Sequence, residues 1–199
     1  MKKEIEYFLL ISPPDRINEQ INLLKRACAK HIGSFYSMKS KAHISLCKVI
    51  DEEDHPGQLS DIMQCYLRFA AKEIGQISPC NLKIDGFGYF THGSKFRTIY
   101  AVINRTDEVT TWVDKLREKL LIDRSIIPHI TIARKIPTEA FDILWPHFQK
   151  LTYKESFTAD HLMVLSREFN KPYQPYRVFK QIAFDRSVKE FADFIRSAS

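Results

Sequence analysis

Two short segments with the same pattern decide the fold: His43-Ile44-Ser45-Leu46-Cys47-Lys48 and His129-Ile130-Thr131-Ile132-Ala133-Arg134. Their positions match in residue identity or in chemical class, and each alternates the way a β-strand with one buried face does. Strict alternation would place three side chains of each segment on one face, namely His43, Ser45 and Cys47, and His129, Thr131 and Ala133. Lys48 and Arg134 lie at an odd offset from the histidine, so we expect them to point away from that face.

The chain repeats itself around these segments. Apolar runs at residues 7–11 and 99–103 predict buried strands, and aligning them sets Tyr7 against Ile99. A helix with one apolar face follows each run and starts near Asp15 or Asp107. The apolar faces consist of Ile17, Ile21, Leu24 and Cys28 in the first copy and of Val109, Val113, Leu116 and Leu120 in the second. We therefore expect a single bilobal domain over residues 1–199, with copies starting near residues 5 and 97.

The remaining elements complete each copy. Further helices are predicted at about residues 56–74 and 137–151. The remaining strands are predicted at residues 81–90, 96–104, 157–167 and 176–184. This order predicts an α+β protein with a bilobal, pseudo-twofold duplicated fold, in which two mainly antiparallel sheets flanked by helices surround a central cleft.

Composition and charge narrow the class of protein. Of the 199 residues, 44% are hydrophobic and 27% charged, which is ordinary for a soluble globular protein. No apolar run approaches the roughly 20 residues of a membrane helix, and no signal-peptide cleavage site follows the first residues. The four cysteines show neither C-x-x-C spacing nor clustering with histidine, so we expect reduced thiols and a cytoplasmic location. The net charge of +6 permits an anionic partner but equally supports solubility, and nothing requires more than a monomer.

The two motifs together suit acid–base chemistry at a phosphodiester. If a pseudo-twofold axis brings His43 and His129 to one cleft, one imidazole can take a proton from an attacking water or hydroxyl. The other can protonate the departing ribose oxygen. The hydroxyls of Ser45 and Thr131 can donate hydrogen bonds to the non-bridging oxygens, and this chemistry requires no metal or other cofactor. A single His-x-Ser/Thr match is weak, since the segment at residues 92–94 also matches and is interpreted as a turn. The duplication therefore carries the functional interpretation.

At these residues the chain resembles the two-histidine phosphoesterase superfamily, specifically its LigT-type group of RNA 2',3'-cyclic phosphodiesterases and 2'-5' RNA ligases. Residues 7–14 are similar to the opening strand of the group, and residues 86–100 to its central hairpin. Leu165-Ser166 followed by Tyr173 resembles the last stretch. The resemblance implies metal-free cleavage of cyclic phosphates on RNA ends or nucleotides. It also implies the following roles: His43 and His129 as the catalytic pair, Ser45 and Thr131 as phosphate binders.

Three functions remain open at this point. The first is a phosphodiesterase that opens ribose 2',3'-cyclic phosphates to 2'-phosphomonoesters, and the second is a 2'-5' RNA ligase that uses the same groups. The third is a non-catalytic nucleotide- or RNA-binding module. The similarity of the two motifs gives no basis for assigning the acid and the base.

Several side chains that flank the motifs are further candidates for substrate binding. Aromatic rings there can stack on a base, although packing explains aromatic residues in strands at least as well. Basic side chains can contact phosphate or remain solvated. The candidates are Phe8, Lys41, Phe90, Arg97 and Tyr100, together with Tyr7, Lys39 and Lys95. The other histidines, which have no matched partner, are interpreted as structural or surface residues: His31, His55, His147 and His161.

Overall fold

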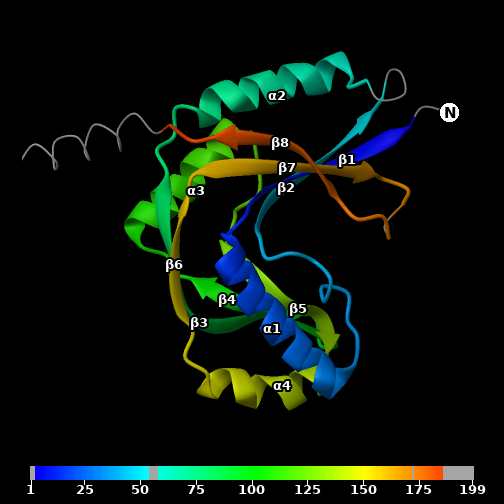
Figure 1. The fold of residues 1–199 in the computed structure, drawn as a ribbon, viewed down its shortest axis with the longest axis vertical. Helices are drawn as coiled ribbons and strands as arrows, with labels where there is room; N and C mark the ends of the chain where they lie inside the picture. The colour runs from blue at the N-terminus through cyan, green and yellow to red at the C-terminus, as the bar shows by residue number, and fades with distance from the viewer. Residues whose placement is uncertain (1–2, 54–57, 172, 186–199) are drawn as a thin grey trace, which may run out of the picture.

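The computed structural model describes residues 3–53, 58–171 and 173–185. These residues form two four-stranded antiparallel sheets, one in each half of the molecule (Figure 1). The first sheet has the order β2 (Ile44–Glu52), β1 (Glu4–Ile11), β7 (His161–Glu168) and β8 (Arg177–Ala183). The second has the order β5 (His129–Pro137), β4 (Phe96–Ile103), β3 (Cys80–His92) and β6 (Lys154–Ala159). The predicted α+β class with two antiparallel sheets is confirmed.

Four helices flank the sheets in the described part of the chain: α1 (Asp15–Ile32), α2 (Asp61–Ile74), α3 (Asp107–Lys119) and α4 (Thr138–Lys150). Although α1 follows β1 of the first sheet, it packs against α4 and against β5 of the second (Figure 1). In the other half, α2 packs against α3 and β8. Helix α1 therefore ties the two halves together. Within the described residues, no helix has both the length and the hydrophobicity needed to cross a membrane.

The sequence of α1 explains its position. Its buried residues Ile17, Ile21, Lys25 and Cys28 recur at helical spacing and form one stripe. The predicted apolar face is confirmed, except that Lys25 lies deeper than Leu24, which is only partly buried. Asp15 and Asp107 are the first residues of α1 and α3, as predicted.

Strand β1 is buried on both faces, which accounts for its unbroken apolar run. Alternate side chains, from Ile5 to Ile11, belong to the main core. Between them, Phe8 and Leu10 pack with Met163 of β7 in a smaller cluster on the opposite face.

Both motif strands contain a β-bulge at the same place. Leu9 of β1 pairs with Cys47 and Leu10 pairs with Ser45, so Leu46 is an extra residue in the ladder. In the second sheet Ile99 pairs with Ala133 and Tyr100 with Thr131, so the extra residue is Ile132. Leu46 and Ile132 occupy the same position of the two motifs.

The sequence suggested strict alternation along each motif. Because of the bulges, this prediction is wrong after Ser45 and Thr131. Cys47 and Ala133 turn to the core, because they lie opposite core residues of the neighbouring strands. Lys48 lies opposite Phe8 and therefore shares the face of Ser45. The expectation that Lys48 and Arg134 point away from the cleft is thus incorrect, since the extra residue reverses the alternation after it.

Two predicted boundaries and one predicted strand alignment also differ from the structure. The strand predicted at residues 157–167 is interrupted at Asp160, where the chain passes from β6 in the second sheet to β7 in the first. Helix α2 begins at Asp61 after the capping residue Ser60, and the predicted start at Pro56 lies outside the described residues. The ladders also match Leu9 rather than Tyr7 with Ile99, so the strand alignment was displaced by two residues.

We predict that Ile21→Ala destabilises the protein by about 2–5 kcal/mol, because it removes a fully buried side chain from the helix that joins the halves. The matched control is Leu23→Ala on the same helix, where the side chain is 58% exposed and we expect a change within about 0.5 kcal/mol. Urea unfolding followed by circular dichroism measures both. Equal losses in the two variants would contradict the packing described for α1.

Candidate active site

The two motifs meet in one cleft of about 540 Å³. Its lining includes both histidines and both hydroxyl residues: His43, Ser45, His129 and Thr131. The predicted convergence of the motifs on one cleft is therefore observed.

The two histidines are held in the same way. Nδ1 of His43 lies 2.7 Å from the carbonyl oxygen of Lys41, and Nδ1 of His129 lies 2.7 Å from the carbonyl oxygen of Ile127. A carbonyl can only accept, so each Nδ1 carries a proton and donates it to this bond. The other ring nitrogen, Nε2, is then an acceptor in the neutral imidazole and a donor in the imidazolium. Both rings are thus arranged to exchange protons through Nε2.

Helix α1 fixes the segment that leads into the first motif. The side-chain oxygen Oδ1 of Asn18 accepts a hydrogen bond of 2.8 Å from the backbone N–H of Ala42. The buried Lys25 donates through Nζ to the carbonyl oxygen of Ser40 at 2.6 Å. Because α1 also packs on β5, it helps to fix the position of the first motif relative to the strand that carries the second.

Burial and positive charge keep both imidazoles neutral. Burial lowers the pKa of His43 to about 4, and the positive charges of Lys25, His129 and Arg134 act in the same direction, against the carbonyl of Lys41. Burial also lowers the pKa of His129, with a smaller contribution from Arg134, while the carbonyl of Ile127 opposes the shift. Both rings are therefore bases near neutral pH.

Aromatic rings support each imidazole edge-on. The Phe8 ring meets His43 at a centroid distance of 5.2 Å and an angle of 88°. The Phe90 ring meets His129 at 4.9 Å and 82°, and Tyr100 also contacts His129 at 5.2 Å. Tyr100 packs closely over Gly88, where an added Cβ would lie 2.8 Å from the tyrosine hydroxyl. This glycine leaves room for the ring that supports His129.

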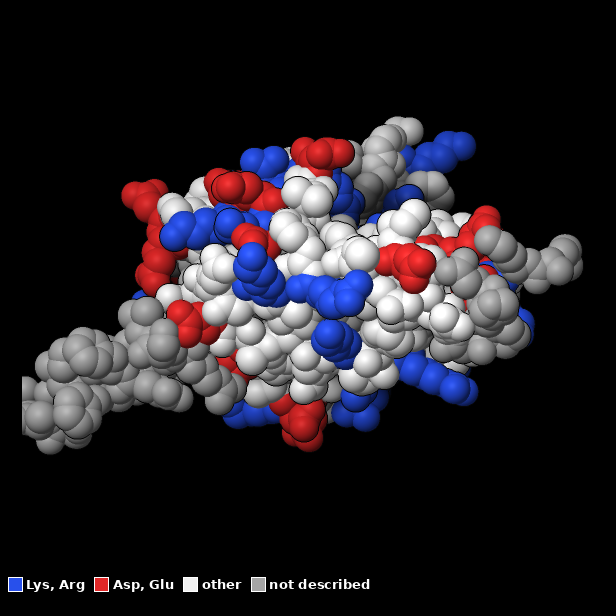
Figure 2. Space-filling model, turned by 90° about the horizontal axis from the view of Figure 1, so that it is seen from above, with Lys and Arg blue, Asp and Glu red and all other residues white. Residues whose placement is uncertain are grey.

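The described lining of the cleft carries five cations and no carboxylate: Lys48, Arg124, Arg134, Lys135 and Arg167. Elsewhere the charges are mixed, as on the face that lies uppermost in Figure 1, where basic and acidic side chains are interspersed (Figure 2). The cleft therefore suits an anionic ligand more than the net charge alone would indicate.

A buried carboxylate holds the basic residues at the β2 end of the cleft. Glu6 is 6% exposed and accepts from Lys48 Nζ at 3.0 Å, from Arg167 Nη2 at 2.7 Å and from the Tyr176 hydroxyl. Burial would raise the pKa of Glu6, but the hydrogen bonds from Tyr176, Lys48 and Arg167 outweigh it and keep the pKa below its usual range. The carboxylate is thus ionised and offsets part of the positive charge at this end.

The β5 end of the cleft has a different arrangement. Arg134 lies over the ring of Tyr36 at 5.8 Å, and Lys135 has a positive φ of 47°. The buried Thr98 hydroxyl accepts from the backbone N–H of Lys135 at 3.0 Å and lies 2.9 Å from Nε2 of His92. His92 was interpreted as a turn residue, but it ends β3 and lines the cleft.

The other predicted candidates divide into two groups. Phe8 and Phe90 line the cleft, whereas Lys41, Arg97 and Tyr100 do not. The side chain of Lys41 is exposed, and only its carbonyl reaches His43. Arg97 donates to the carbonyls of Gly93 and Phe96 at the hairpin turn.

Of the remaining candidates, Tyr7 is 3% exposed in the main core, and neither Lys39 nor Lys95 is part of the lining. His31 and His147 are exposed and stack on each other, and His161 contacts Asp160. His55 lies outside the described residues. No group of three metal-ligating side chains is present among the described residues.

Several residues of the lining were not predicted from the sequence or were set aside, among them the basic residues and Tyr176: Lys48, Arg124, Arg134, Lys135, Arg167 and Tyr176. The sequence contained a signal for two of these residues, because Lys48 and Arg134 are basic at equivalent places of the two motifs.

Comparison with known proteins agrees with this architecture. A solved structure of TT0787 from Thermus thermophilus is similar, with a TM-score of 0.61 and 15% identity over 90% of this chain and 97% of that one. LigT of E. coli in complex with 3'-AMP has a TM-score of 0.58 and 18% identity over 92% of this chain and 98% of that one. At these identities the likeness shows the fold alone. No curated protein sequence matches significantly.

A family model for the 2'-5' RNA ligase superfamily matches residues 13–171. This span contains both histidine motifs and most of the chain. The chain therefore belongs to the 2'-5' RNA ligase superfamily.

Proposed function

We propose that the protein is a metal-independent phosphodiesterase that opens ribose 2',3'-cyclic phosphates, on RNA ends or nucleotides, to 2'-phosphomonoesters. The observation that carries the proposal is the presence of His43 and His129 in one cleft, each with Nδ1 bonded to a carbonyl and Nε2 left for proton transfer. Membership of the superfamily supports a phosphoester substrate. Structures of E. coli LigT with 3'-AMP and with phosphate support a ligand of this class.

The proposed reaction needs two proton transfers. The neutral imidazole removes a proton from water while the water oxygen forms a bond to phosphorus. The bond between phosphorus and O3' breaks, and the protonated imidazole gives its proton to O3'. The product has a 2'-phosphate and a free 3'-hydroxyl, and the two imidazoles have exchanged protonation states.

The charges around the rings favour one assignment of these roles. His43 faces the positive charges of Lys25, His129 and Arg134, whereas Arg134 is the cation that acts on His129. We therefore assign His43 as the base and His129 as the acid. Ser45 and Thr131 would donate to the non-bridging oxygens, and Lys48 and Arg134 on the same face would balance the phosphate charge.

We predict that His43→Ala or His129→Ala lowers kcat about 10²–10⁴-fold, since each change removes one proton transfer. The assay follows hydrolysis of 2',3'-cyclic nucleotides and of RNA oligonucleotides with a cyclic end, in EDTA. Comparison with 2'- and 3'-phosphate standards identifies the product. The control is His147→Ala, which changes an exposed histidine of α4 and should leave the rate unchanged.

The double variant of His43 and His129 separates an enzyme from a binding module. An enzyme loses turnover while the variant stays folded. If the wild-type protein turns over no member of the substrate panel and the double variant still binds nucleotide, the catalytic proposal is wrong.

We predict that kcat/KM falls about tenfold per pH unit above the higher of the two histidine pKa values, which lies below the ordinary 6.5. The sign follows because the productive free enzyme needs one protonated imidazole, and a lowered pKa confines that form to acidic pH. Bound phosphate should raise both pKa values, so kcat should hold to higher pH than kcat/KM. Titration of the ring signals by NMR, with and without inorganic phosphate, tests this directly. A histidine in the cleft that titrates above 6.5 in the free protein would refute the stated cause.

Ligation is the second candidate function, and it is supported by the match to the 2'-5' RNA ligase superfamily. The same groups would let an RNA 5'-hydroxyl replace water, so that a 2'-5' phosphodiester forms as the bond to O3' breaks. RNA halves with a 2',3'-cyclic phosphate and a 5'-hydroxyl distinguish the two. We expect hydrolysed ends to dominate, and a longer product joined 2'-5' as the main product would reverse this assignment.

A further inference from the structure

Each motif bulge is contacted by a side chain from the segment that precedes the other motif. Ser37, shortly before the first motif, donates from Oγ to the carbonyl oxygen of Ile132 at 3.0 Å and accepts from the N–H of Arg134 at 3.0 Å. Arg124, shortly before the second motif, donates from Nη2 to the carbonyl oxygen of Leu46 at 2.9 Å. Leu46 and Ile132 are the extra residues of the two bulges.

These contacts supply partners that the ladder does not. An extra residue in a bulge is left unpaired by the neighbouring strand, and the ladder is locally disrupted there. A carbonyl that remained without a partner near the core would cost free energy. Ser37 and Arg124 therefore stabilise the bulged form of the strand over a regular one.

The segment that carries Ser37 is firmly anchored. Ser37 is 4% exposed, and its carbonyl accepts from the Ser40 hydroxyl at 2.8 Å. Ser40 in turn accepts from Nζ of Lys25, which is 1% exposed on α1 and whose pKa burial lowers to about 8. The contact to the β5 bulge thus rests on a helix rather than on a free loop.

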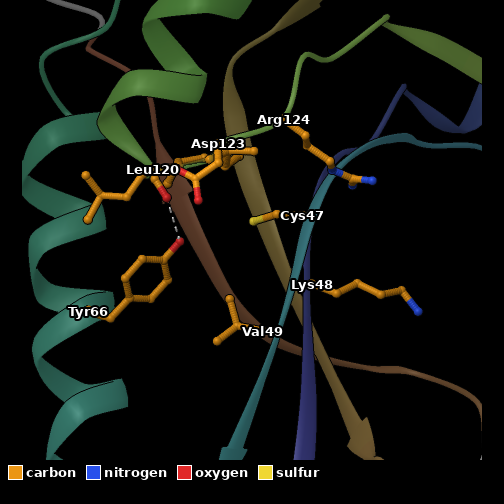
Figure 3. A pocket seen from close by; sticks show the side chains of 9 residues that line it. Cys47, Lys48, Val49, Tyr66, Leu120, Asp123 and Arg124 are labelled. Atoms are coloured by element: carbon orange, nitrogen blue, oxygen red, sulfur yellow. Dashed lines mark hydrogen bonds between the residues drawn. The ribbon is translucent and has the colours of Figure 1, made fainter.

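The segment that carries Arg124 is anchored on the far side of β2. The Tyr66 hydroxyl of α2 donates to the carbonyl of Leu120 at 3.3 Å, beside a cavity of about 370 Å³ (Figure 3). In this view Cys47 points from β2 towards Tyr66 while Lys48 points to the other side, and Arg124 reaches the strand from its loop. Cys47 and Lys48 therefore lie on opposite sides of β2 (Figure 3), and the extra residue Leu46 places Lys48 on the side of Ser45.

We propose that Ser37 and Arg124 are positioning residues that act crosswise: Ser37 sets the geometry of Thr131 and Arg134, and Arg124 sets that of Ser45 and Lys48. Without the bulge, the basic residue of each motif would turn to the opposite face of its strand. The inference rests on the proposed function for its effect on turnover, but its structural part does not depend on the reaction.

The test compares Ser37→Ala and Arg124→Met with Ser34→Ala and Arg105→Met, which change exposed residues at other positions in the connecting segments. Three measurements are made on the full chain: amide hydrogen exchange, ring signals of both histidines during titration with inorganic phosphate, and kcat and KM on a cyclic nucleotide. Arg124→Lys, which keeps a charged donor, is the rescue variant.

For Ser37→Ala we expect amide exchange at Arg134 to accelerate about tenfold or more. The largest changes in the ring signals should occur at His129, not at His43, although His43 is closer to Ser37 in the sequence. For Arg124→Met we expect the converse, with changes at residues 45–48 and His43. Each variant should bind inorganic phosphate several-fold more weakly and lose about tenfold in kcat, whereas the controls match wild type. Arg124→Lys should recover part of the loss.

Effects confined to the motif next to each substitution, or spread equally over both, would overturn the inference. The measurements also distinguish failure of the positioning inference from failure of the proposed function. If wild type hydrolyses no cyclic phosphate, the proposed function fails, while exchange and phosphate titration still test the crosswise contacts. If wild type is active and the variants lack the crosswise pattern, the positioning inference fails alone. Should Ser37→Ala not fold, Arg124→Met tests it from the other side, because Arg124 is exposed.

Discussion

A regular β-strand cannot place a hydroxyl and the third residue after it on the same face, because its side chains alternate. Both motifs nevertheless present such a pair to the cleft, Ser45 with Lys48 and Thr131 with Arg134. The extra residue in each ladder resolves this constraint by reversing the alternation after the hydroxyl. The same reversal turns Cys47 and Ala133 into the core, so the basic face of the cleft and the hydrophobic packing behind it both depend on the bulge in each motif strand.

The electrostatics of the cleft follow from this arrangement. Burial and surrounding cations make protonation of His43 and His129 costly. A phosphate placed between the rings would raise both histidine pKa values, since its negative charge stabilises the imidazolium and offsets the charge of the surrounding cations. In the proposed reaction, ligand binding would thereby favour the protonated imidazole that the leaving group needs. Because each Nδ1 is bonded to a carbonyl, the proton transferred in the proposed reaction would be carried at Nε2.

Much of the fold could be predicted from the sequence, because the spacing of apolar side chains reveals helices and strands. The helical face of α1 and the twin motifs follow from spacing alone, and the duplication made a weak pattern informative. The bulges were not accessible, since an inserted residue changes the hydrogen-bond ladder without leaving a compositional mark, and Leu46 and Ile132 fit a regular strand equally well. The break at Asp160 was missed for a similar reason, because the sequence of β6 and β7 resembles that of a single continuous strand. Residues such as Arg124 and Tyr176 reach the cleft through long-range packing that local patterns do not encode.

Near-symmetry alone would give two equivalent histidines, whereas the proposed reaction needs one acid and one base. The chain breaks the equivalence through the residues around the motifs. At the β2 end, the ionised Glu6 binds Lys48 and Arg167 and reduces their net charge, while Lys25 from α1 adds a buried cation near His43. At the β5 end, Arg134 and Lys135 lie beside Thr131 without an equivalent carboxylate in the described lining. In the proposed reaction the two motif strands would supply matched proton-transfer groups, and the buried cation of Lys25, which adds to the effect of burial in lowering the pKa of His43, would favour His43 as the base.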